Sequence, residues 1–297
     1  MYDSGQALQA FDLKTSMPIL HTGVAGVIIF FLISGYLMPK TISRCTSLKE
    51  FFLRRAIRIY PLLLCAILYS HIRFHDFSIS KITALILPFA DFFYAELIVH
   101  AVDWTLRIEF FYYILLSLMY FKGIFSFKSN IICIGLTSIL VASTYFYNEQ
   151  YFNYRLIYLN FIFVGSQFYL IQKDGFLNST KNKLTACLLV WSIAIFSFCR
   201  VQSAYLLPGL LFGTLIFFLA YLVGRLFPNL NSMKTLTFLG SLSYPSYLLH
   251  MLVFVDIFQL TKSHFLTFIS FLSICYLSNI LIEKPSIKKF KSMLKPI

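Results

Sequence analysis

Long apolar segments, separated by short polar stretches, constrain this chain more than any other feature of its sequence. A transmembrane helix needs about 20 predominantly apolar residues. Nine segments are candidates for such helices: residues 19–38, 56–72, 105–121, 131–147, 156–171, 184–198, 205–223, 238–258 and 265–282. Residues 77–100 are also apolar, but Pro88, Asp91 and Glu96 interrupt them, and we interpret them as a loop with a re-entrant or interfacial part. The pattern predicts an all-α, polytopic membrane bundle of about nine helices.

The composition excludes an ordinary water-soluble domain. Apolar residues make up 59% of the 297 residues and charged residues only 12%, whereas a soluble domain has about 45–50% apolar and about 25% charged residues. We therefore expect a single integral-membrane domain over residues 1–297. The six cysteines are scattered and form no C-x-x-C pair, so we predict neither a disulfide framework nor a metal site.

The distribution of lysine and arginine indicates how the segments are oriented. If the loops after the first, third, fifth and seventh segments and the C-terminus are cytoplasmic, then 18 of the 25 basic residues lie on that side. This is the positive-inside bias of membrane proteins, and it accounts for the net charge of +13 without a nucleic-acid partner. Residues 283–297 then form a basic cytoplasmic tail that contacts anionic lipids, and residues 1–18 form an external loop.

Charged residues within the apolar segments are the first candidates for function, because charges inside a membrane are costly. Arg107 and Glu109 lie near the start of the third segment, after Asp103 and Trp104. Glu109 either forms an ion pair or acts as an acid/base group.

Arg55 and Arg58 are three residues apart, so they share one face of a helix. They are either a positive-inside flank or a clamp for phosphate groups, which guanidinium groups bind in bidentate geometry. Pro61 predicts a kink close to them.

Two further stretches contain polar residues. His250, inside the eighth segment, is either a buried neutral side chain or a proton carrier in a polar pocket with Ser243, Tyr244 and Tyr247. Glu283 is expected to pair with a cytoplasmic arginine, and Pro285 to end the last helix.

These stretches, taken in order, resemble the acyltransferase-3 family of bacterial membrane O-acyltransferases. The matching motifs are Gly-Val-x-x-Phe-Phe-x-x-Ser-Gly-Tyr at 26–36, the arginine-rich motif that ends at Pro61, Trp-Thr-Leu-x-x-Glu-x-x-Tyr at 104–112, Ser-Tyr-x-x-Tyr-Leu-x-His at 243–250, and Glu-Lys-Pro at 283–285. Five motifs in the same order span residues 23–285.

The resemblance implies a helical membrane enzyme of the bacterial inner membrane. It implies transfer of an acyl group, usually acetyl from acetyl-CoA as donor substrate, to a hydroxyl of a surface polysaccharide or glycolipid, such as the O-antigen of lipopolysaccharide. It also implies that Arg55 and Arg58 bind the donor, and that Glu109 and His250 line the catalytic pocket. The remaining partners would be membrane lipids, and no bound cofactor is expected.

One departure from the family concerns its first helix, which carries an arginine and a histidine that is taken as the catalytic base. Residues 1–20 resemble the loop that follows that helix, and His21 has no arginine at the matching spacing. We therefore expect either a start assigned too late or a truncated, inactive family member. A glycan polymerase or flippase and a proton-coupled transporter are the other classes that the pattern allows.

Overall fold

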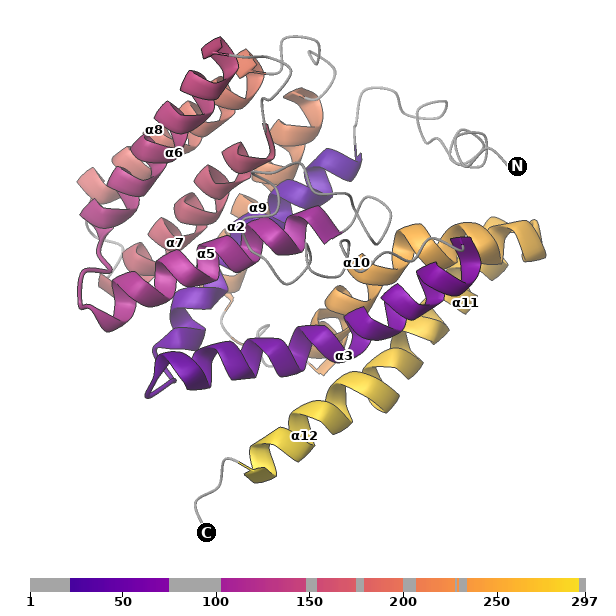
Figure 1. Cartoon of the computed structure of the whole chain (residues 1–297). Helices are drawn as coiled ribbons and strands as arrows, with labels where there is room; N and C mark the ends of the chain where they lie inside the picture. The colour runs from indigo at the N-terminus through magenta and orange to yellow at the C-terminus, as the bar shows by residue number, and fades with distance from the viewer. Residues whose placement is uncertain are drawn as a thin grey trace.

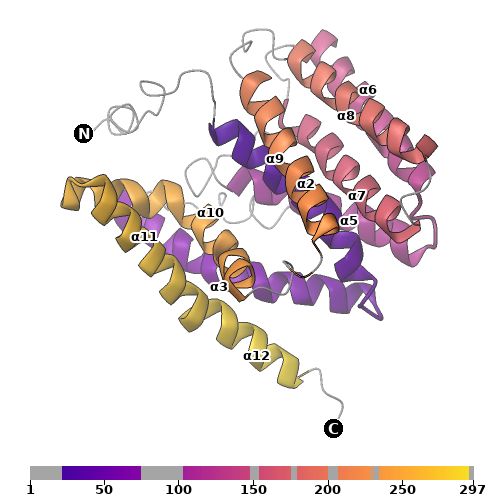
Figure 2. The same ribbon diagram turned by 180° about the vertical axis from the view of Figure 1, so that it is seen from behind.

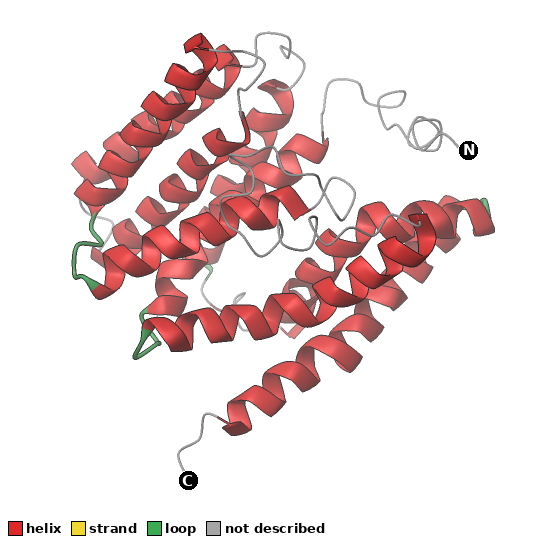
Figure 3. Cartoon of the chain, viewed as in Figure 1, coloured by secondary structure: helices red, strands yellow, loops and turns green. Residues whose placement is uncertain are grey.

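The structure is a computed structural model, and it describes residues 22–74, 103–147, 154–174, 179–199, 207–227, 229 and 234–293. The predicted external loop at 1–18, His21, the segment at 77–100 and the end of the basic tail lie outside the described residues. Every regular element in the described part is helical (Figure 3), which confirms the all-α prediction. The α-helices are α2 (Thr22–Ile42), α3 (Leu48–Phe74), α5 (Asp103–Phe121), α6 (Phe127–Tyr147), α7 (Tyr158–Asp174), α8 (Ser179–Cys199), α9 (Leu207–Leu226), α10 (Lys234–Thr261), α11 (His264–Ser278) and α12 (Lys284–Met293).

The helices form two groups that meet at α2, α3 and α5 (Figure 1). In the first group, α2 packs against α7 and α9, and α6 and α8 cover another side of α7. In the second group, α10 packs against α11, and α3 lies against α10 and α12. The site described below lies where the two groups meet.

Two glycines set the close approach of α2 and α7. A Cβ atom on Gly35 would lie 1.8 Å from the carbonyl oxygen of Ile162, and one on Gly165 would lie 2.2 Å from that of Leu32. Only glycine allows two backbones to approach this closely, as in the small-residue interfaces of membrane helices. Gly23 and Gly26 of the same helix do not take part in this crossing, because a Cβ atom on either would meet nothing within 4 Å.

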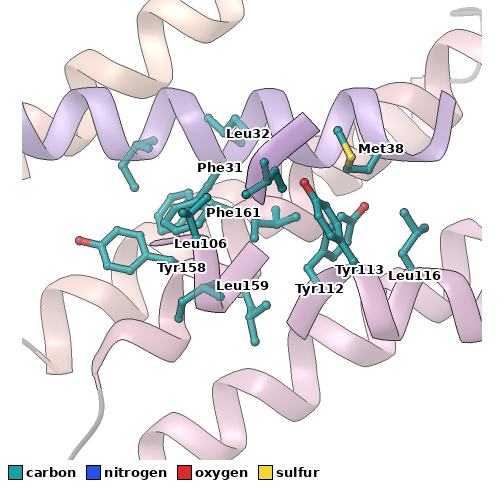
Figure 4. Close-up of a cluster of buried hydrophobic side chains, with 14 of the residues drawn as sticks. Phe31, Leu32, Met38, Leu106, Tyr112, Tyr113, Leu116, Tyr158, Leu159 and Phe161 are labelled. Carbon is teal, nitrogen blue, oxygen red and sulfur yellow. The ribbon is translucent and has the colours of Figure 1, made fainter. Parts of the chain in front are cut away.

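Helix α7 lies in the centre of the first group, and thirteen of its residues are buried. Figure 4 shows the apolar cluster around it, in which Phe31 of α2 and Tyr158 and Phe161 of α7 face one another. The rings of Phe31 and Tyr158 lie 5.2 Å apart, and Trp104 of α5 lies 5.2 Å from Tyr158. This cluster fixes α5 against α2 and α7 and therefore positions Glu109.

Within the described residues, each predicted apolar segment overlaps one of the helices from α2 to α11. Four stretches in the described part are both long and apolar enough to cross a membrane: Gly23–Ile42, Thr180–Phe198, Leu207–Leu226 and His264–Phe290. A fifth is added if Thr237–His250 and Leu252–Thr261, which are bent by 67°, form one span. The chain is therefore a multi-pass membrane protein. Helices α3 and α5 contain the charged residues of the site, which lower their hydropathy.

The prediction that Pro285 ends the last helix is wrong. After α11 the chain makes a π turn at Asn279–Glu283 and continues directly into α12. A proline lacks the N–H group of an α-helical hydrogen bond and crowds the preceding turn, but Pro285 is only the second residue of α12, just after the wider π turn. Helix α12 packs against α3, and Phe290 is buried, so much of the predicted basic tail is an ordered helix.

Candidate active site

A buried carboxylate lies at the centre of the junction between α2, α3 and α5. Glu109 is only 6% exposed, and the hydroxyl of Ser34 on α2 donates a hydrogen bond to its Oε1 atom. The hydroxyl of Tyr113, one helical turn further along α5, is also within hydrogen-bonding reach of this carboxylate. A buried carboxylate needs such donors, because burial without them is costly. Both partners of Glu109 are neutral, so the carboxylate has no direct ion pair with them.

Arg55 brings a positive charge to the other side of Tyr113. Its guanidinium group lies 5.8 Å from the centre of the Tyr113 ring, and its Nη2 atom donates a hydrogen bond of 3.0 Å to the hydroxyl of Thr41. Arg55 is only 7% exposed, and its Nε atom has no hydrogen-bond partner among the described residues. A buried guanidinium has five N–H donors, so Arg55 retains capacity to bind an anion.

Arg58, one turn after Arg55, lies on the side of α3 that faces the second group of helices. It interacts electrostatically with Tyr113, with Tyr244 of α10 and with Glu283 of the π turn. Unlike Arg55, Arg58 is exposed. An exposed guanidinium beside a buried carboxylate is accessible to a ligand that enters the site.

The second group of helices contributes Tyr244 and Glu283. The Tyr244 hydroxyl donates a hydrogen bond of 2.7 Å to the backbone carbonyl of Ile59 on α3. Asn279 donates hydrogen bonds to the Glu283 carboxylate at 2.6 Å and to the carbonyl of Ser241 at 2.9 Å. These bonds hold α10 and the π turn against α3, so that the site contains two arginines and two glutamates whose formal charges cancel.

The structure places His250 apart from this cluster. Its Nδ1 atom lies 2.5 Å from the carbonyl oxygen of Tyr247, in its own helix, and the residue is exposed. The Tyr247 hydroxyl bonds to Thr105 of α5, one turn before Glu109. No hydrogen bond joins His250 to Glu109 among the described residues, so the two predicted catalytic residues lie on neighbouring helices that are connected through Tyr247 and Thr105.

The loop before α3 fixes the orientation of its arginines. Glu50 accepts hydrogen bonds from the backbone N–H of Thr46 and from the side chain of Arg54. The Thr46 N–H and then Arg54 lower the pKa of Glu50 to about 2. Arg54 is thereby paired at the surface, whereas Arg55 lies beside the Tyr113 ring.

Three residues of the site were not predicted from the sequence. Ser34, Tyr113 and Asn279 were not among the candidate site residues. The spacing contained a signal for two of them: Tyr113 follows Glu109 by four residues, and Asn279 precedes Glu283 by four, which is the spacing of helix neighbours. Of the predicted polar pocket around His250, Ser243 instead bonds to the Gly240 carbonyl of its own helix.

The described residues contain no group of three or more His, Cys, Asp or Glu side chains that could hold a metal ion. The arrangement is instead that of a buried carboxylate held by hydroxyl donors, with an arginine pair beside it. Such a site can accept or donate a proton and can bind an anionic ligand.

Comparison with known proteins gives one extensive match and one short one. A family model described as an acyltransferase domain matches residues 6–283. Nodulation protein 10 of Rhizobium leguminosarum bv. viciae is 45% identical over 53 residues, which are 18% of this chain and 12% of that protein. The chain thus spans only a small part of the length of that curated relative. No solved structure matches the chain significantly.

Proposed function

This chain belongs to the acyltransferase domain family, and we propose that it is a membrane O-acyltransferase that moves an acetyl group from acetyl-CoA to a hydroxyl group of a sugar in a surface polysaccharide or glycolipid. The family supports acyl transfer, and the apolar helices support a multi-pass membrane protein. The acetyl donor, the sugar acceptor, the inner-membrane location and the cytoplasmic C-terminus are our proposal.

One observation carries the proposal further than the family does: Glu109 and the arginine pair belong to a single cluster. Tyr113 is within hydrogen-bonding reach of Glu109, and its ring contacts Arg55. A carboxylate that handles a proton is therefore next to guanidinium groups that recognise phosphate.

We assign the arginines to the donor. The donor carries phosphate groups, and arginine binds phosphate in bidentate geometry. Arg55 is buried with an unused Nε donor among the described residues, and Arg58 is exposed beside it. The two guanidinium groups would hold the anionic part of the donor while its thioester lies near Glu109.

We assign Glu109 to proton transfer. The acceptor hydroxyl oxygen attacks the thioester carbonyl carbon, a C–O bond forms, the C–S bond breaks, and the hydroxyl proton ends on the sulfur of the departing coenzyme A. Glu109 would accept that proton from the hydroxyl and pass it to the leaving thiolate. Ser34 and Tyr113 would hold the carboxylate in place, and His250 would act as a second proton carrier or hydrogen-bond donor on the acceptor side.

The test is the alkali-labile acetate content of the surface polysaccharide in cells that lack the gene, complemented with wild type or variants. Wild type should restore acetate, whereas Arg55→Ala and Arg58→Ala should abolish it or raise the donor requirement. Arg54→Ala is the matched control, because Arg54 is the neighbouring arginine paired with Glu50 at the surface. Glu109→Gln should reduce acetylation by roughly 10²–10⁴-fold, the usual effect of losing an acid/base group.

Two results would contradict the proposal. Full acetylation by Arg55→Ala and Arg58→Ala at normal protein levels would rule out the donor role of the arginines. If the wild-type chain changed the polymer's length or export without changing its ester content, the protein would not be an O-acyltransferase.

A further inference from the structure

A cavity of about 280 Å³ lies on the side of α2 away from Glu109, between α2, α7 and α9. In Figure 2 α9 lies in front of α2, and α7 lies next to them. The cavity has apolar walls from α2 and α9 and a polar end. Its walls include Ile29, Ile33, Leu37, Ile216, Phe217 and Ala220.

The three helices that surround this cavity are parallel. Along α2 and α9, Ala25 meets Gly213 near one end, and Leu37 and Arg225 line the cavity at the other. Along α2 and α7, Phe31 meets Tyr158, and Tyr36 bonds to Gln172 further on. The carboxyl ends of α2, α7 and α9 therefore lie at the same end of the cavity.

That end is polar and basic. The Tyr36 hydroxyl donates a hydrogen bond to Gln172, and Arg225 interacts electrostatically with Tyr221, with the two tyrosine rings 5.9 Å apart. Each of the three helices has a basic residue in its last turn, which is Lys40 in α2, Lys173 in α7 and Arg225 in α9. The positive-inside distribution assigns this end to the cytoplasmic side.

The cavity therefore combines apolar walls within the membrane with positive charge at the level of the lipid headgroups. Basic residues at the cytoplasmic end of membrane helices attract anionic headgroups, and apolar walls suit an acyl chain. Basic residues at a helix end alone would attract the headgroup but would offer no cavity for the acyl chain.

We propose that this cavity binds an anionic glycerophospholipid of the cytoplasmic leaflet. One acyl chain lies along Ile29, Ile33 and Phe217, and the phosphate group lies near Arg225, with Lys40 and Lys173 around it. The inference uses none of the residues assigned to acyl transfer, so it stands or fails independently of the proposed function.

The experiment is native mass spectrometry of the purified full chain, titrated with phosphatidylglycerol or with phosphatidylcholine of the same acyl chains. We expect wild type to retain phosphatidylglycerol at least fivefold better than phosphatidylcholine. Arg225→Gln should lose most of this preference, and because Arg225 is exposed the variant should keep its fold. Lys183→Gln, an exposed charge on α8 away from the cavity, is the matched control and should keep the preference.

A second variant tests the cavity rather than the charge. Ala220→Phe should fill the cavity and reduce retention of both lipids. Ile139→Phe, at a 67% exposed position on α6, should leave retention of both lipids unchanged. Equal retention of the two lipids by wild type would overturn the proposal. So would unchanged retention of phosphatidylglycerol in Ala220→Phe, or an undiminished preference in Arg225→Gln.

Discussion

Replacing Gly35 by alanine should separate α2 from α7 and destabilise the whole first group of helices. The new Cβ atom would lie 1.8 Å from the carbonyl oxygen of Ile162 and 2.8 Å from its carbonyl carbon. Both obstacles belong to the backbone, so no side chain can rotate away. Reaching the 3.4 Å of an ordinary contact requires a movement of about 1.6 Å.

That movement also breaks a hydrogen bond. The Ser166 hydroxyl donates to the Gly35 carbonyl at 3.2 Å and bonds to Tyr112 at 2.6 Å. Overpacking costs about 1–3 kcal/mol, and losing a hydrogen bond costs about 1 kcal/mol more. The expected loss is therefore about 2–4 kcal/mol, or roughly 3–6 °C in the thermal midpoint of a chain of this size.

The assay is the thermal midpoint of detergent-solubilised protein, followed by size-exclusion chromatography after heating. Gly26→Ala is the matched control, because it lies on the same helix and its Cβ would meet nothing within 4 Å. Gly165→Ala should behave like Gly35→Ala, since its Cβ would lie 2.2 Å from the Leu32 carbonyl oxygen. If Gly35→Ala were as stable as Gly26→Ala, the close crossing of α2 and α7 would be refuted.

Three other predictions concern polar groups outside the glycine crossing. The buried Asn160 of α7 forms hydrogen bonds with two residues of α6. Asn160→Ala should therefore lower the free energy of unfolding by about 0.6–1.7 kcal/mol, the size of interhelical hydrogen bonds in membranes. An unchanged thermal midpoint would contradict this. The hydrogen bond from the Thr46 N–H, and then that from Arg54, lower the pKa of Glu50 to about 2. The Glu50 carboxylate therefore stabilises the fold fully above about pH 4.5, and this stabilisation is lost as the pH falls toward 2. The difference in thermal midpoint between wild type and Glu50→Gln should therefore shrink from pH 5 to pH 3, and a constant difference would show that the carboxylate is not responsible. Asp256→Asn should weaken the packing of α10 against α3, because Asp256 accepts a hydrogen bond from Tyr69. A double-mutant cycle with Tyr69→Phe should show a coupling energy of about 1 kcal/mol. Additive effects of the two substitutions would exclude the contact.

The sequence was sufficient for the fold class and for the face of α3 that carries Arg55 and Arg58. Apolar segments of membrane length allow few structures other than helices, because backbone groups in lipid must bond within their own segment. The spacing of Arg55 and Arg58 then follows from helix geometry alone. Local patterns of this kind could be predicted because they depend only on neighbours along the chain.

The contacts between distant residues could not be predicted in this way. Ser34 and Glu109 are 75 residues apart, and whether they meet depends on how α2 and α5 rotate and cross. The crossing depends in turn on Gly35 and Gly165, whose pairing has no local signal. The continuation of the chain through Pro285 was missed for a related reason, since a π turn cannot be recognised from apolar periodicity.

The π turn at Asn279–Glu283 gives the site a dependence on the phase of a helix. A π turn takes up one residue more than an α turn, and one residue corresponds to a rotation of about 100°. Deleting a single residue here would restore a regular α-helix and leave the length of α12 unchanged. That deletion would keep the direction of the α12 face that packs on α3, whereas closing the turn to α geometry without a deletion would rotate that face by about 100° relative to α11. The geometry of this turn, as much as residue identity, therefore determines whether Glu283 and Asn279 stay beside Arg58.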